Sequence, residues 1–135
     1  NSYSDMAVVA NTAYVYRVRA VNGSGPSANS APDLATTIFF TDTPLNGVAI
    51  KALHLSQIRA AIDAVRTLAG TAGGAAYTDG TAGTTVKAVH INELRTVIDA
   101  ARAALGLPTP AYADVGANGV TVRAMDFQEP RARLQ

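Results

Sequence analysis

The residues with the most versatile chemistry in this 135-residue chain are its two histidines, which occupy the same place in a repeated segment. His54 and His90 are 90 − 54 = 36 residues apart, and a partial third copy has Asp126 at the same offset. Further polar and glycine positions keep this offset: Lys51/Lys87, Arg59/Arg95, Asp63/Asp99, Arg66/Arg102 and Gly70/Gly106. Two imidazoles and one carboxylate would make a minimal transition-metal site. The commoner role of a histidine in the first helical turn is a hydrogen bond, and we expect one that ties each turn to the next repeat.

A second set of candidate ligands consists of three aspartates, each two residues after an aromatic residue: Asp42, Asp79 and Asp114. Each precedes a glycine-containing turn and then a helix, an order that faintly resembles calcium-binding loops. A calcium loop needs several oxygen ligands and a closing carboxylate. Glu93 could serve in the second copy, but Gln57 stands at that position in the first. We therefore favour aspartates that accept backbone N–H bonds within turns, and keep calcium or carbohydrate binding as the alternative.

Sequence patterns that would indicate catalysis are weaker than either of these two sets of candidate ligands. Serines such as Ser4 and Ser56 lie in no nucleophile-elbow context, no pair of carboxylates is placed for a glycosidase cleft, and the glycines lack the spacing of phosphate loops. The chain has no cysteine, which removes disulfides, thiolate zinc sites and cysteine nucleophiles. We expect no enzyme activity and no cofactor.

The repeated segments must position these side chains, and each predicts a helix. Apolar residues recur at spacings of three and four in two copies: Leu55, Ile58, Ile62 and Val65, then Ile91, Leu94, Ile98 and Ala101. Arginines and aspartates at positions such as Arg59, Asp63 and Arg66 predict surface ion pairs along one flank. Gly70 and Gly106 are predicted helix C-caps. A short β-branched piece precedes each helix: 47–50, 83–86 and 119–122. Pro130 predicts that the third helix is short or broken, as suits a terminal cap.

The N-terminal part predicts antiparallel strands. A nine-residue stretch from Tyr14 alternates strictly, with Tyr14, Tyr16 and Val18 on one face. A turn is predicted at 22–27, a second extended segment at 34–40, and another turn near Asn11. We expect the two tyrosines to be core aromatics, with a contact role as the alternative.

Residues 2–37 resemble the last three strands of a fibronectin type III domain, through an aromatic-x-aromatic-Arg-Val-x-Ala-x-Asn run, a Gly-x-Ser turn and a Ser-rich strand ending in Ala-x-Thr. The first four strands of that family have no counterpart here. Such a half sandwich would expose an apolar sheet face and open edges.

Residues 39–135 resemble a repeat found at the C-terminal end of many large extracellular bacterial proteins. Its pattern is aromatic-Thr-Asp, a turn, then Lys/Arg-Ala-x-His-x-x-Glu-Leu-Arg and a helix closing on Leu-Gly-Leu-Pro; the second copy, 77–108, fits it best. The resemblance implies a secreted or cell-surface location and a modular context. It implies no agreed activity.

Composition sets further bounds. The 11 basic and 10 acidic residues give a net charge of +1, which does not favour a nucleic-acid partner. No apolar run approaches the length of a membrane span. Because the first residue is Asn1 rather than methionine, we expect a fragment or a processed product.

These observations predict an α+β chain, with an N-terminal antiparallel β segment followed by about two and a half β-turn-α repeats and two main amphipathic helices. The expected units are 1–38, 39–75, 76–110 and 111–135. The expected function is a non-catalytic extracellular module for self-assembly or attachment of a larger bacterial surface protein. Its partners would be identical copies or other subunits. The predicted contact residues are Tyr14, Tyr16, Val18, His54, Arg59, His90 and Arg95.

Overall fold

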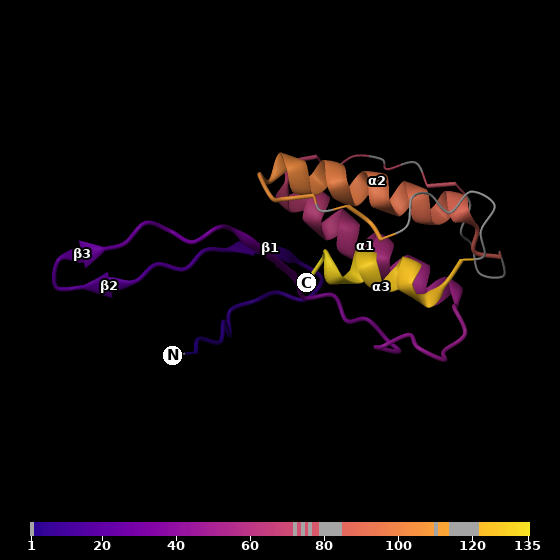
Figure 1. The fold of residues 1–135 in the computed structure, drawn as a ribbon, viewed down its shortest axis with the longest axis horizontal. Helices are drawn as coiled ribbons and strands as arrows, with labels where there is room; N and C mark the ends of the chain where they lie inside the picture. Colours follow the sequence, from indigo (N-terminus) through magenta and orange to yellow (C-terminus); the bar gives the residue numbers. More distant parts are fainter. Residues whose placement is uncertain are drawn as a thin grey trace.

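The computed structural model describes residues 2–71, 73, 75, 77–78, 85–109, 111–113 and 122–135. Among these residues four short strands come first and three helices follow, so the predicted mixture of helix and antiparallel strand is confirmed. The strands form a long hairpin that projects from a compact group of helices (Figure 1).

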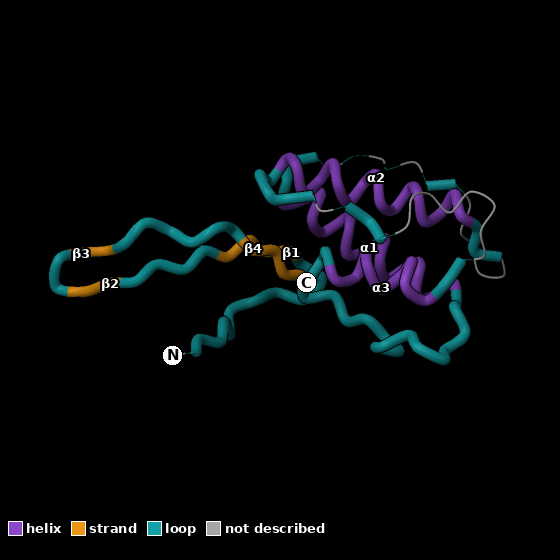
Figure 2. The backbone as a smooth tube through the Cα atoms, in the orientation of Figure 1, coloured by secondary structure: helices purple, strands orange, loops and turns teal. Residues whose placement is uncertain are grey.

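The projecting hairpin, which we call the arm, spans residues 12–37. Strand β1 (Ala13–Tyr16) pairs antiparallel with β4 (Asp33–Thr36) at its base, and β2 (Val21–Asn22) pairs with β3 (Gly25–Pro26) at its tip. Figure 2 shows the tip as the part of the arm farthest from the helices. At the tip, Asn22 Oδ1 accepts a bond of 2.9 Å from the Ser24 N–H, an Asx turn that explains the predicted break in the strand.

Two serines join the paired regions of the arm. The Ser27 and Ser30 N–H groups donate to the carbonyls of Ala20 and Val18 at 2.8 and 2.7 Å. The hydroxyls of the same serines accept the Ala20 and Val18 N–H groups at 3.0 and 2.9 Å. The serine side chains thus replace ladder carbonyls, so the hairpin continues where regular strand pairing stops.

The base of the arm is anchored on the helices by the face opposite the tyrosines. Ala13 and Leu34 are buried, and Val15 packs partly against the same core. Tyr16 is 36% exposed, so the expectation of a core role is wrong for this tyrosine. The small Ala13 allows close approach to the helices, and alternation then turns Tyr14 and Tyr16 away.

The helices are α1 (Ala52–Leu68), α2 (Ala88–Ala104) and α3 (Ala124–Ala132), and each packs against the other two. Both predicted apolar stripes are buried, with every member at most 2% exposed. The third helix adds Phe127, which is fully buried. As predicted, α3 is short, but it runs through Pro130 to Ala132.

Both long helices end as predicted. Gly70 and Gly106 each have φ of 69°, a conformation that glycine adopts without a Cβ penalty. Beyond them the Thr71 N–H donates to Arg66 C=O and the Leu107 N–H donates to Arg102 C=O, both at 2.9 Å. These are Schellman motifs, which satisfy carbonyls that the last helical turn leaves open.

The expectation of short β pieces before the helices is wrong in the described residues. Residues 47–50, 85–86 and 122 form no strand. The chain there is extended at each helix N-cap, with φ near −112°, but none of the described strands pairs with it. The β-branched residues instead cover the helical core: Val48, Ile50, Val86 and Val122.

Candidate functional site

The residue shared by the two histidine copies and the aspartate copy acts first as a helix cap. His54 Nδ1 accepts the Lys51 N–H at 3.1 Å, and His90 Nδ1 accepts the Lys87 N–H at the same distance. In the third copy Asp126 Oδ2 accepts the Arg123 N–H at 2.7 Å. The side chain three residues into the helix thus satisfies the N-cap N–H, which is one half of a capping box. Histidine and aspartate can replace each other because both provide an acceptor there.

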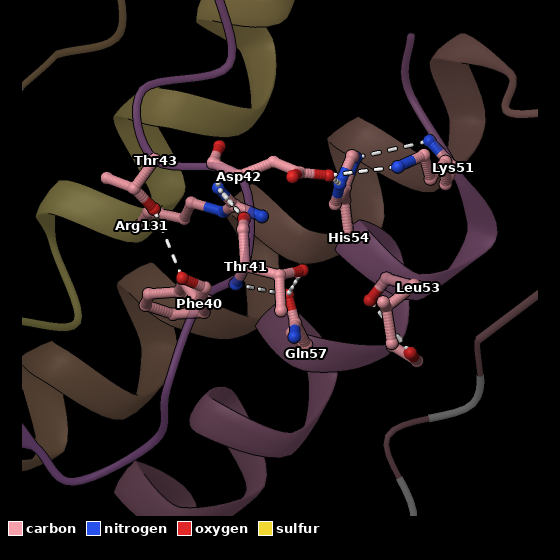
Figure 3. Close-up of polar contacts among 10 residues, drawn as sticks. Phe40, Thr41, Asp42, Thr43, Lys51, Leu53, His54, Gln57 and Arg131 are labelled. Carbon is pink, nitrogen blue, oxygen red and sulfur yellow. Dashed lines mark hydrogen bonds and ion pairs between the residues drawn. The ribbon is translucent and has the colours of Figure 1, made fainter. Parts of the chain in front are cut away.

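The other ring nitrogen of His54 faces its own repeat. Nε2 lies 3.1 Å from Asp42 Oδ2, which also receives the Lys51 ammonium at 3.0 Å (Figure 3). Because Nδ1 accepts a backbone N–H, the proton of neutral His54 resides on Nε2 and points at Asp42. The expected contact from this histidine to the next repeat is therefore wrong. The bond from Lys51, and then that from His54, lowers the pKa of Asp42 below 3.8.

In each helix a glutamine or glutamate side chain accepts a backbone N–H from the loop before that helix. This role was not predicted from the sequence. Gln57 Oε1 accepts both the Thr41 N–H and the Thr41 hydroxyl at 3.2 Å. Glu93 accepts the Thr78 N–H at 3.0 Å and also its hydroxyl, and Glu129 accepts the Ala113 N–H at 3.0 Å. The signal was available, because these three positions keep the 36-residue offset.

Contacts between repeats centre on one arginine in each helix. The Arg59 guanidinium lies 4.4 Å from the centroid of the Tyr77 ring, and that of Arg95 lies 4.6 Å from Tyr112. Each arginine thus covers the aromatic residue that opens the next repeat, a favourable cation–π geometry. Arg59 also donates to the Thr78 C=O at 3.1 Å. The predicted flank pairing applies to Arg66, which lies 3.4 Å from Asp63, while Arg59 connects one repeat to the next.

The helix of the third repeat contacts the loop of the first repeat. The Arg131 guanidinium lies 5.0 Å from the centroid of the Phe40 ring, and Nη1 donates to the Thr41 C=O at 3.2 Å. Figure 3 shows this arginine beside the loop that carries Phe40 and Thr41. The arginine contacts therefore run from repeat one to two, two to three, and three to one. We call these contacts the three junctions. They correct the expectation that the third repeat is a terminal cap, because its helix closes a ring.

The predicted contact residues separate into two groups. Tyr16 and Val18 lie exposed on the arm, and Tyr14 is half-buried beside them; the centroids of the two tyrosine rings are 6.1 Å apart. The repeat positions are used inside the chain instead. His54 and His90 are at most 1% exposed, and the side chains of Arg59 and Arg95 are 16% and 7% exposed within their junctions. Of these seven predicted residues, those on the arm are the ones most accessible to another molecule.

The described residues give little support for the predicted metal and ligand sites. Asp79 and Asp114 lie outside the described residues, and the Asp42 carboxylate already faces two basic side chains. In the part of the chain that the structure describes, no three His, Asp or Glu side chains gather as a metal site would require. Likewise, none of the described helices has the length and hydropathy to cross a membrane.

Comparison of this chain with models of known protein families, with curated proteins and with solved structures finds no match.

Proposed function

We propose that this chain is a non-catalytic extracellular module that mediates self-assembly or attachment of a larger bacterial surface protein, and that the arm makes the contact. The observation that carries the proposal is the projection of the arm from the closed ring of helices (Figure 1). The secreted or cell-surface location rests on the resemblance of residues 39–135 to repeats of extracellular bacterial proteins.

The arm has the properties of an incomplete sheet. Each of its two described sheets contains only two strands, so the outer edges present backbone N–H and C=O groups. A two-stranded ribbon alone is marginally stable in water. The arm also exposes large apolar side chains, with Val18 and Val21 at 73% and 72%. Addition of strands from another polypeptide would satisfy the edges and cover these residues.

The helical ring supplies a rigid mount for the arm. Ala13 and Leu34 fix its base against the helical core. Thr37 locks the same end, because its hydroxyl accepts the Thr12 N–H at 2.9 Å and donates to the Val9 C=O at 2.6 Å, while its N–H donates to the Thr12 C=O at 2.9 Å. A partner on the arm would therefore be held at a defined orientation.

Sedimentation velocity over a concentration series tests the proposal. We expect the wild type to associate, and Val18→Lys to weaken association because a charge on the exposed face opposes its burial. Leu53→Lys is the matched control, since Leu53 is 49% exposed on α1, away from the arm. A chain that stays monomeric up to about 1 mM, the weak end of specific binding, would refute self-assembly. Equal loss of association in both variants would refute the role of the arm.

A further inference from the structure

The three junctions differ in one chemical respect. At the first, Arg59 Nη2 lies 4.0 Å from Glu93 Oε2. At the second, Arg95 Nη2 lies 3.3 Å from Asp126 and 3.4 Å from Glu129. The third junction has Gln57 where the others have glutamate, so the amide is neutral where the equivalent group carries a charge. Arg131 is therefore the one junction arginine with no carboxylate from this position.

Arg131 is nevertheless buried, with 4% of its surface exposed. Its Nη1 contacts the carbonyls of Thr41 and Asp42 at 3.2 and 3.5 Å. Its Nε and Nη2 have no hydrogen-bond partner among the described residues. Carbonyl dipoles and a phenyl ring balance a buried positive charge only in part, and burying a charge without a counter-ion is costly.

The nearby groups are already engaged. Gln57 Oε1 accepts two bonds from Thr41, and the Asp42 carboxylate is held by Lys51 and His54. Figure 3 shows the carboxylate of Asp42 directed toward His54 and Lys51, away from the guanidinium of Arg131. The counter-charge that Glu129 gives to Arg95 is thus missing for Arg131.

A cavity of about 240 Å³ lies at this junction, and Arg131 is one of the residues that line it. The loop before α1 contributes Thr43, Pro44, Leu45 and Asn46, and the end of the chain contributes Gln128, Ala132 and Gln135. The lining thus combines a cationic residue and several amide or hydroxyl groups with a short apolar wall. It has room for a small organic acid or for one acidic side chain.

We propose that the cavity at the third junction binds a carboxylate, with Arg131 as its cationic partner. The ligand supplies at this junction the charge that glutamate supplies at the other two. Its carboxylate is that of a free small acid or of an acidic side chain on another polypeptide. Binding would join α3 to the loop before α1 and so strengthen the closure of the ring. The site is independent of the arm and of the proposed function.

Thermal unfolding in sodium acetate and in sodium chloride at equal ionic strength and pH 7 tests the site. A ligand bound only by the folded chain raises the midpoint, by about 5 °C at ten times its dissociation constant for a chain of this size. We expect this rise for the wild type. The variant Gln57→Glu places the missing carboxylate inside the junction, so its midpoint should be higher in chloride and should no longer respond to acetate.

Two further variants separate the site from a general effect of the anion. Arg131→Met should lose the acetate response. Ser56→Glu adds the same charge to an exposed neighbour of Gln57 and should keep it. Equal midpoints for the wild type in the two salts would overturn the proposal, as would an acetate response that persists in Arg131→Met or in Gln57→Glu.

The source of the carboxylate is distinguished by a second probe, N-acetylglutamate α-amide, which carries only a side-chain carboxylate between two peptide groups. A rise in the midpoint with acetate alone indicates a site for free small acids. A rise with both probes, lost in Gln57→Glu, indicates that the cavity admits an acidic side chain of a protein.

Discussion

Replacement of His54 by leucine and by glutamine is expected to separate its capping role from its packing role. Leucine has a similar volume but no acceptor for the Lys51 N–H, which His54 Nδ1 now accepts at 3.1 Å. Glutamine can take over that bond, since Gln at this helical position accepts the N-cap N–H in a capping box. The two variants differ in whether the first turn of α1 keeps its acceptor and in whether a donor remains near Asp42, which His54 Nε2 now contacts at 3.1 Å.

The expected magnitude follows from the burial of this bond. Loss of a helix cap costs about 0.5–2 kcal/mol, and a buried donor left without a partner costs about 1–3 kcal/mol. These two values describe the same loss and are not added. Because His54 is fully buried and leucine nearly conserves its volume, the cavity contribution is small. We expect His54→Leu to be less stable than His54→Gln by about 1–2 kcal/mol.

Urea denaturation followed by circular dichroism measures this difference from the transition midpoints, provided that the slopes agree. His90→Leu and His90→Gln should show the same order, because His90 makes the equivalent bond to Lys87. Nitrogen NMR of the imidazole rings gives an independent check, with the proton of His54 expected on Nε2. Equal stability of the leucine and glutamine variants, or a proton on Nδ1 of the neutral ring, would refute the capping role.

Three further predictions use single residues. Asp42→Asn should be less stable than wild type at pH 7, and the gap should close as the pH falls below 3.8. The reason is that bonds chiefly from Lys51 lower the pKa of folded Asp42, so its contribution is present above the unfolded pKa and lost below the folded one; a gap as large at pH 2 as at pH 7 would contradict this. Burial raises the pKa of Tyr77 to about 12, so its stabilising contribution should fall between pH 10 and 12, and Tyr77→Phe should remove that part of the alkaline loss of stability measured by denaturation. Gly70→Ala should cost about 1–2 kcal/mol in urea denaturation because φ is 69° there; unchanged stability would argue against the left-handed cap.

The parts of the fold that the sequence predicted are those set by neighbours along the chain. The apolar spacing of α1 and α2 and the glycines after them depend only on local periodicity and backbone conformation, and both were confirmed. The expected core role of Tyr16 is wrong for a physical reason. Alternation shows that two faces differ, but it does not show which is buried, and the small Ala13 lies against the helices in place of the large Tyr16.

The junctions were harder to predict because their partners are distant in the sequence. The contact between Arg131 and Phe40 joins residues 131 − 40 = 91 positions apart, and no local pattern specifies it. The offset of 36 residues placed Arg59, Arg95 and Arg131 in equivalent positions. It could not show whether the third arginine has a partner, since an open stack and a closed ring have the same repeat period.

Closure changes what the third repeat contributes to stability. In an open stack a terminal repeat contacts one neighbour and its loss removes one interface. Here α3 packs against both α1 and α2, and Arg131 reaches back to the loop of the first repeat. The third repeat therefore contributes two interfaces, and the junction that returns to the first repeat is the one without a glutamate at the position of Gln57.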